Sequence, residues 1–95
     1  MKKGYVYIMA NKYNTVLYTG VTSTLVKRVY EHKTGCGSEF TRKYHLKKLV
    51  WFNEYPTIRD AIEAEKRIKK WKREWETKLI REINPDFKDL YDQIL

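Results

Sequence analysis

The sequence predicts an α+β fold with a sandwich-like layout, in which a three-stranded antiparallel sheet is flanked by helices. Two short segments rich in β-formers, residues 3–10 and 15–22, follow each other closely. A third segment, residues 45–55, holds a continuous apolar run, which is typical of a strand covered on both faces. The remaining apolar residues recur at helical spacing. A chain of 95 residues suits one core, so residues 1–95 are expected to form one domain.

The first two segments, KGYVYIMA and TVLYTGVT, are predicted to form a β-hairpin around the turn NKYN. Strand side chains alternate between faces. On the first strand Tyr5, Tyr7 and Met9 are expected to share one face, opposite Val6 and Ile8. On the second, Val16, Tyr18 and Gly20 share one face, opposite Leu17, Thr19 and Val21. If Tyr7 and Tyr18 lie on the same side of the sheet, two phenols project together beside open space at Gly20, and a strand glycine often marks a close approach by a ligand or another backbone. The alternative is that amphipathic tyrosines merely pack at a sheet surface.

A helix is expected next, capped by Thr22 or Ser23 and running to about residue 33. Arg28 and His32 lie four residues apart on the helix face that also carries the apolar side chains. A solvated arginine belongs on the opposite face, so Arg28 is expected at the border between sheet and helix. The alternative leaves Arg28 extended over the core and His32 at the surface.

Residues 35–44 (GCGSEFTRKY) are predicted to form a loop. Its glycine amides, hydroxyls and cations suit a phosphate, which makes Ser38, Thr41 and Arg42 candidate contacts. A flexible surface loop without a ligand is the alternative. Cys36 is the only cysteine, so it has no internal disulfide partner, and it is interpreted as an incidental loop thiol.

After the third strand, Thr57 and Asp60 form a capping-box-like start to a helical pattern over residues 58–83, with a break expected near residues 71–74. Glu65 falls inside the apolar arc of this pattern. A carboxylate on the buried side of a helix needs a cation, hydrogen bonds or a metal ion. A structural ion pair and a metal ligand are both open interpretations of Glu65.

Charge favours an anionic partner, above all nucleic acid, because 20 Lys and Arg against 12 Asp and Glu give a formal net charge of +8. Six of the eight residues 66–73 (KRIKKWKR) are cations, and Lys69 is expected to contact a nucleic-acid backbone; a solvated helix face is the alternative. No run approaches the ~20 apolar residues of a membrane helix, and the start is too polar for a signal peptide. A cytoplasmic protein without membrane association is expected.

The hairpin motif resembles the signature of the GIY-YIG endonuclease superfamily: Tyr5-Val6-Tyr7, ten residues, then Tyr18-Thr19-Gly20. The chain as a whole is similar to the small stand-alone bacterial members. Tyr5 stands where the family name has Gly, and Thr19 stands where it has Ile. The resemblance continues through residues that stand in family order along the chain, namely Arg28, His32, Glu65 before the Ile68–Trp71 stretch, and Asn84-Pro85 ahead of a short tail helix over residues 86–95.

The resemblance implies the GIY-YIG nuclease fold and a metal-dependent endonuclease, acting on DNA rather than RNA, on structured or single-stranded forms, in repair or recombination. Glu65 is then expected to hold one divalent cation, Mg²⁺, which takes few protein carboxylates. Arg28 offers a planar fork to phosphate oxygens. Tyr18 is expected to hydrogen-bond to phosphate or water, and Asn84 to position a phosphate.

Two residues compete for the role of general base. Tyr7 is preferred, with a pKa expected to fall near Arg28 and a metal ion. His32 is the other candidate, either as the base or as the residue that orients Tyr7. Two further functions remain open: a non-catalytic DNA- or RNA-binding module on the same fold, and an interaction protein that uses Trp71 and Trp75. A monomer is expected.

Overall fold

The computed structural model describes residues 2–95 and contains a three-stranded antiparallel sheet. Its strands are β1 (Gly4–Ala10), β2 (Leu17–Thr22) and β3 (Lys48–Tyr55), in the order β2-β1-β3. The predicted fold class and the hairpin are both confirmed, because β1 pairs antiparallel with β2 and with β3. This order makes β1 the central strand and leaves β2 as an edge strand.

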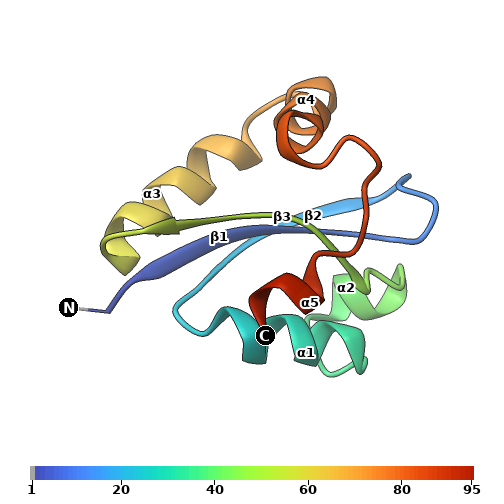
Figure 1. Cartoon of the computed structure of the whole chain (residues 1–95), viewed down its shortest axis with the longest axis horizontal. Helices are drawn as coiled ribbons and strands as arrows, with labels where there is room; N and C mark the ends of the chain where they lie inside the picture. The colour runs from blue at the N-terminus through green and yellow to red at the C-terminus, as the bar shows by residue number, and fades with distance from the viewer. Residues whose placement is uncertain (1) are drawn as a thin grey trace.

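Helices cover both faces of the sheet (Figure 1). On one face lie α3 (Ile58–Lys69) and α4 (Arg73–Ile83); on the other lie α1 (Leu25–Lys33), α2 (Glu39–Lys43) and α5 (Tyr91–Ile94). The alternation along β1 separates two apolar clusters. The first includes Val6, Ile8, Ala10, Val50, Trp51, Ala61, Ala64, Ile68 and Ile80; the second includes Tyr7, Met9, Leu25, Val29, Leu46, Leu49 and Leu90. Tyr7 thus lies on the α1 face of the sheet, as the alternation predicts.

The start of α1 differs from the expected cap. Thr24, not Thr22 or Ser23, occupies the N-cap position, and its side chain makes no capping hydrogen bond. The Thr22 hydroxyl instead accepts a hydrogen bond from the Thr24 amide at 3.0 Å. Thr22 therefore shapes the turn between β2 and α1.

The prediction of a loop over residues 35–44 is wrong in part, because α2 forms within it. Ser38 caps this helix: its backbone is extended, and its hydroxyl accepts a hydrogen bond from the Thr41 amide at 3.3 Å. Glu39 adds a negative charge to the first turn, where it interacts favourably with the positive end of the helix dipole. This single turn fixes the position of Thr41 next to α1.

The predicted break in the long helical segment is confirmed, since α3 ends at Lys69 and α4 begins at Arg73. The predicted start of α3 is confirmed too, because the Thr57 hydroxyl accepts from the Asp60 amide at 3.1 Å. Between the helices, Trp71 packs against the apolar cluster beneath α3 and α4.

The tail helix is shorter than predicted. Residues 84–90 carry the chain past β3 to the opposite layer (Figure 1), where the Leu90 amide donates to the Leu49 carbonyl at 2.7 Å. Phe87 is buried, and its φ of 51° lies in the left-handed region, which cannot continue a helix. The helix therefore begins only at Tyr91. No helix within residues 2–95 is both long and apolar enough to cross a membrane.

Candidate active site

Three rings gather on the α1 face of the sheet beside the edge strand β2. The ring centroids of Tyr7 and Tyr18 are 6.4 Å apart, as expected for two phenols on one face of the hairpin. The imidazole of His32 lies 5.6 Å from the first ring and 5.8 Å from the second. His32 is buried, which excludes the alternative of a surface histidine.

A chain of hydrogen bonds fixes how these groups share protons. The Tyr7 hydroxyl lies 2.9 Å from His32 Nε2, and His32 Nδ1 lies 3.0 Å from the Thr41 hydroxyl. The Ser38 carbonyl, 3.0 Å from the Thr41 hydroxyl, can only accept a proton; with the Thr41 proton directed there, the Thr41 oxygen is free to accept from His32 Nδ1–H. His32 Nε2 is then the acceptor and Tyr7 the donor. The phenol of Tyr7 is thereby aimed at a base able to take its proton.

Burial sets the charge state of this pair. Desolvation raises the pKa of Tyr7 above its ordinary value, the neighbouring Tyr18 raises it further, and Arg28 opposes both effects. Desolvation lowers the pKa of His32, and Arg28 lowers it further. Near neutral pH the site therefore holds a neutral phenol beside a neutral imidazole. The expected fall in the pKa of Tyr7 is wrong for the protein alone, because burial outweighs the charge of Arg28.

Two glycines make room for the pair. Gly20 stands opposite Tyr7 in the hairpin, and a Cβ there would lie 2.5 Å from the Tyr7 hydroxyl. A Cβ at Gly37 would overlap His32 Nδ1 and lie 3.0 Å from the Thr41 hydroxyl oxygen. The open space expected at Gly20 is thus filled by a tyrosine ring, and Gly20 is buried. The expected role of Gly20 as a phosphate contact is corrected, because Gly20 instead leaves room for the ring of Tyr7.

Arg28 lies at the rim of the ring cluster. Its side chain is 45% exposed, and its Nε lies 3.2 Å from a Glu31 carboxylate oxygen. Its charge lowers the pKa of both Tyr7 and His32, so the guanidinium is close to both groups. Arg28 can therefore meet a phosphate from solvent while facing the buried pair.

Glu65 approaches the same cluster from α3. Its side chain is 14% exposed, and its carboxylate lies 3.2 Å from Lys69 Nζ one helical turn later. Lys69 Nζ in turn lies 5.4 Å from the centre of the Tyr18 ring, and the charge of Glu65 raises the pKa of Tyr7. Glu65 is thus linked to the β2 edge through Lys69, and the charges of Glu65 and Arg28 both act on the Tyr7 phenol. The ion pair with Lys69 is the partner that a half-buried carboxylate needs.

A hollow of about 440 Å³ spans this edge. Its lining comes from both layers and consists of Leu17, Tyr18, Thr19, Phe40, Lys69 and Glu76. Glu76 of α4 accepts a hydrogen bond from the Thr19 hydroxyl at 3.1 Å, and burial raises the pKa of this carboxyl. The sequence gives no signal for Glu76, because its position depends on how α4 sits after the break.

Glu65 fits one mode of metal binding. Within residues 2–95, no three His, Cys, Asp or Glu side chains are grouped to hold a metal ion. A caged Zn²⁺ or Ca²⁺ therefore finds no donor set in that part of the chain. Mg²⁺ keeps most of its waters and is often held by one or two carboxylates together with substrate phosphates, so the single half-buried carboxylate of Glu65 is a sufficient protein ligand for it.

Several predicted phosphate contacts serve the fold instead. Asn84 is 5% exposed, and its amide nitrogen donates to the Val50 and Lys88 carbonyls at 3.0 and 2.9 Å. Its oxygen accepts from the Lys88 amide at 3.0 Å, so Asn84 ties the end of α4 to β3, the edge opposite the site. Thr41 is buried against His32. The expected phosphate roles of Asn84 and Thr41 are therefore corrected.

The other three candidates keep their position at the surface. Ser38 and Arg42 are exposed, and the Lys69 side chain is 47% exposed beside Tyr18. Their contact with a phosphate stays a prediction. Cys36 is exposed too, as expected for a loop thiol.

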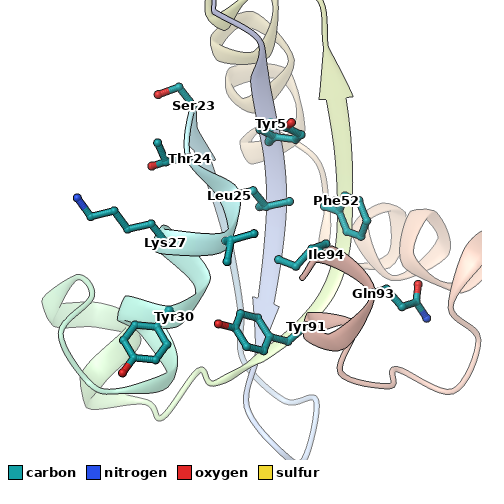
Figure 2. A pocket seen from close by; sticks show the side chains of 11 residues that line it. Tyr5, Ser23, Thr24, Leu25, Lys27, Tyr30, Phe52, Tyr91, Gln93 and Ile94 are labelled. Carbon is teal, nitrogen blue, oxygen red and sulfur yellow. The ribbon is translucent and has the colours of Figure 1, made fainter.

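A larger hollow, of about 710 Å³, lies away from this cluster (Figure 2). It opens between the start of α1 and the tail helix α5, and its lining includes Tyr5, Leu25, Phe52, Tyr91 and Ile94. None of the predicted site residues lines it. Within the described chain, its lining holds no His, Asp or Glu side chain and no arginine to meet a phosphate, so the ring cluster remains the better candidate for chemistry.

The buried His32 predicts a stability that falls in acid. Its pKa is lowered in the folded protein by burial and Arg28, with Glu31 opposing. As pH falls through about 6.5, the unfolded chain takes up the proton first, so unfolding is favoured until the folded pKa is passed. Thermal denaturation from about pH 8 to about pH 5 is expected to show a falling Tm. Substituting His32→Gln should flatten this dependence, whereas His45→Gln, at an exposed histidine, should preserve it.

Comparison with known proteins gives consistent matches. The model of the GIY-YIG catalytic domain matches residues 3–88. A UPF0213 protein of Clostridium perfringens is 42% identical over 76 residues, which cover 80% of this chain and 81% of that protein. A UPF0213 protein of Syntrophus aciditrophicus is 36% identical over 87 residues, or 90% and 98% of the two chains. The solution NMR structure of a UPF0213 protein from Bacillus halodurans aligns with a TM-score of 0.58 at 26% identity, covering 92% of each chain. The UPF0213 names of the relatives and of the solved structure state no activity.

Proposed function

Because this chain belongs to the GIY-YIG catalytic-domain family, we propose that it is an endonuclease that hydrolyses phosphodiester bonds in DNA with the help of one Mg²⁺ ion. The observation that carries the proposal is the hydrogen-bond chain from Tyr7 through His32 to Thr41, placed beside the charges of Arg28 and Glu65. We further propose that residues 1–95 act as one monomeric domain in repair or recombination, on structured or single-stranded DNA.

Proton transfer through Tyr7 and His32 supplies the nucleophile in this proposal. A water molecule gives its proton to the Tyr7 oxygen as the Tyr7 proton passes to His32 Nε2, 2.9 Å away. The resulting hydroxide attacks phosphorus, the bond from phosphorus to the leaving oxygen breaks, and the leaving oxygen takes a proton from solvent; His32 later returns its extra proton to solvent. The Nδ1–H bond to Thr41 stabilises the imidazolium that forms. Both candidate bases thus take part, with His32 as the final acceptor.

Charge on the phosphate is met from two sides. Arg28, whose side chain is 45% exposed, offers a planar fork that matches two phosphate oxygens. Glu65 is proposed to hold the metal ion, which when bound polarises the phosphate and helps the leaving oxygen. In the absence of metal the Lys69 ammonium pairs with Glu65, so a metal ion on Glu65 would free this ammonium to contact the phosphate. Tyr18, which lies beside Lys69, can orient the phosphate or the water.

The metal role of Glu65 has a direct test. Glu65→Gln keeps the size of the side chain but removes the charge, so the cleavage rate with Mg²⁺ is expected to fall about a hundredfold. Duplex, hairpin, flap and single-stranded oligonucleotides should all be assayed. Glu63→Gln, at an exposed position of the same helix, is the matched control and should cleave normally. Equal cleavage by Glu65→Gln and the unmodified protein contradicts the metal assignment.

A second candidate function is a nucleic-acid-binding module without catalysis. The observation that favours it is the ion pair between Glu65 and Lys69, which already satisfies the carboxylate. Such a module predicts salt-sensitive binding that survives both Glu65→Ala and Tyr7→Phe, with no cleavage by the unmodified protein on any of the substrates above.

A further inference from the structure

The junction between α3 and α4 carries an exposed aromatic pair. Trp75 is 58% exposed, and its ring lies 6.1 Å from that of Trp71 at an interplanar angle of 67°. Trp71 is half-buried against the core, so it supports Trp75 from below. A hollow of about 410 Å³ is lined by both rings together with Lys78, Leu79 and Glu82. A large flat side chain thus faces solvent at the lip of a hollow.

The same junction concentrates positive charge that has no acidic partner. Among residues 2–95, only one of its cations, Lys69, lies within ion-pair distance of a carboxylate. The exposed cations without such a partner are Lys66, Arg67, Lys70, Lys72 and Arg73. Further along α4, Lys78 and Arg81 are balanced by Glu74, Glu76 and Glu82, so within these two helices the excess positive charge lies in the segment that surrounds Trp71.

The charge decides between possible partners for this surface. A second copy of the chain would bring together two bodies of net charge +8, which repel. Duplex DNA offers phosphates but keeps its bases stacked within the helix. Unpaired nucleotides offer both a phosphate backbone and free base faces, which is what an aromatic platform within a cationic segment binds.

The junction also adjoins the candidate active site. Lys69 lines the hollow at the β2 edge and lies over the Tyr18 ring, and Trp71 follows two residues later. Two residues span at most about 7 Å of chain. The junction and the hollow at the β2 edge are therefore close along the chain.

We propose that the α3–α4 junction binds unpaired nucleotides, with one base stacked on Trp75 and the flanking phosphates on Lys70, Lys72 and their neighbours. The inference deepens the proposed function, on which it rests, because it names the substrate class: DNA with a single-stranded segment next to the bond that is cut. Fully paired duplex then binds through charge alone.

Binding without metal tests this separately from catalysis. The affinity of a fluorescent oligothymidylate and of a blunt duplex hairpin is measured by anisotropy in EDTA, where cleavage plays no part. Trp75→Ala is expected to weaken single-strand binding about tenfold or more, while Trp75→Phe retains most of it. Ile83→Ala, at a residue of α4 that is 61% exposed, is the matched control and should change neither affinity. Hairpin binding by Trp75→Ala should stay within about twofold of the unmodified protein.

Salt dependence separates the two parts of the surface. Lys70→Ala and Lys72→Ala should each reduce the slope of log affinity against log salt for the single strand by about 0.7, whereas Trp75→Ala should leave the slope unchanged. Equal binding by Trp75→Ala, or an equal loss for strand and hairpin, overturns the inference. So does sedimentation in which Trp75→Ala converts a dimer to a monomer. If Trp75 carries single-strand binding but no substrate is cleaved, the endonuclease proposal fails while the binding surface stands.

Discussion

Tyr7→Phe is expected to lower the rate of DNA cleavage by about a thousandfold, within the range known for removal of a positioned acid or base. The ring remains, and with it the packing against His32 and Tyr18. What disappears is the hydroxyl 2.9 Å from His32 Nε2, and with it the only route proposed for the proton of the attacking water. Single-turnover kinetics with saturating DNA measure the chemical step without product release.

Tyr18→Phe is the matched control for this prediction. Tyr18 is half-buried in the same cluster, yet its hydroxyl makes no hydrogen bond to the protein within residues 2–95. Its loss should lower cleavage by about ten- to a hundredfold, as for one hydrogen bond to phosphate or water. Equal losses for the two variants contradict the assignment of Tyr7 as the proton donor. A large drop in the Tm of Tyr7→Phe assigns Tyr7 a structural role instead.

Gly20→Ala is expected to destabilise the fold strongly. The new Cβ would lie 2.5 Å from the Tyr7 ring, which is held by the pairing of β1 with β2 and is almost fully buried. Overpacking of this kind costs about 1–3 kcal/mol of unfolding free energy. For a chain of this size that is a drop in Tm of about 4–24 °C, measured by thermal denaturation. Any folded fraction should cleave poorly, because the phenol must move away from His32.

A double-mutant cycle isolates the cause. In a Tyr7→Ala background the ring is absent, so adding Gly20→Ala should cost much less than it does in the unmodified protein. Additive losses show that Gly20 is needed for some other reason, such as backbone freedom in β2. That result contradicts the account of Gly20 as the space for Tyr7.

The sequence predicts those features that follow from local periodicity. Alternation along the hairpin places Tyr7 and Tyr18 on one face, and helical spacing turns Glu65 toward the sheet. The break between α3 and α4 and the start of α3 at Thr57 follow from length and capping pattern. The roles proposed from these positions rest on the family, whose activity and metal dependence the names of the relatives do not state.

Long-range contacts set the limit of prediction. Thr41 looks like a phosphate ligand in a glycine-rich segment, and only the fold of α2 reveals that it holds His32. Gly37 requires no special backbone angle, so nothing marks it until the imidazole is placed against it. Asn84 has the chemistry of a ligand, but its hydrogen bonds to β3 and the tail depend on tertiary pairing.

The proton arrangement around His32 is the central claim, and nitrogen NMR of the imidazole tests it most directly. At about pH 7, long-range proton–nitrogen correlations on labelled protein should show Nδ1 protonated and Nε2 bare in the metal-free state. Thr41→Val should shift this tautomer balance, while Tyr7→Phe should leave Nδ1 protonated. An imidazole that carries its proton on Nε2, or that is doubly protonated at this pH, would contradict the relay from Tyr7.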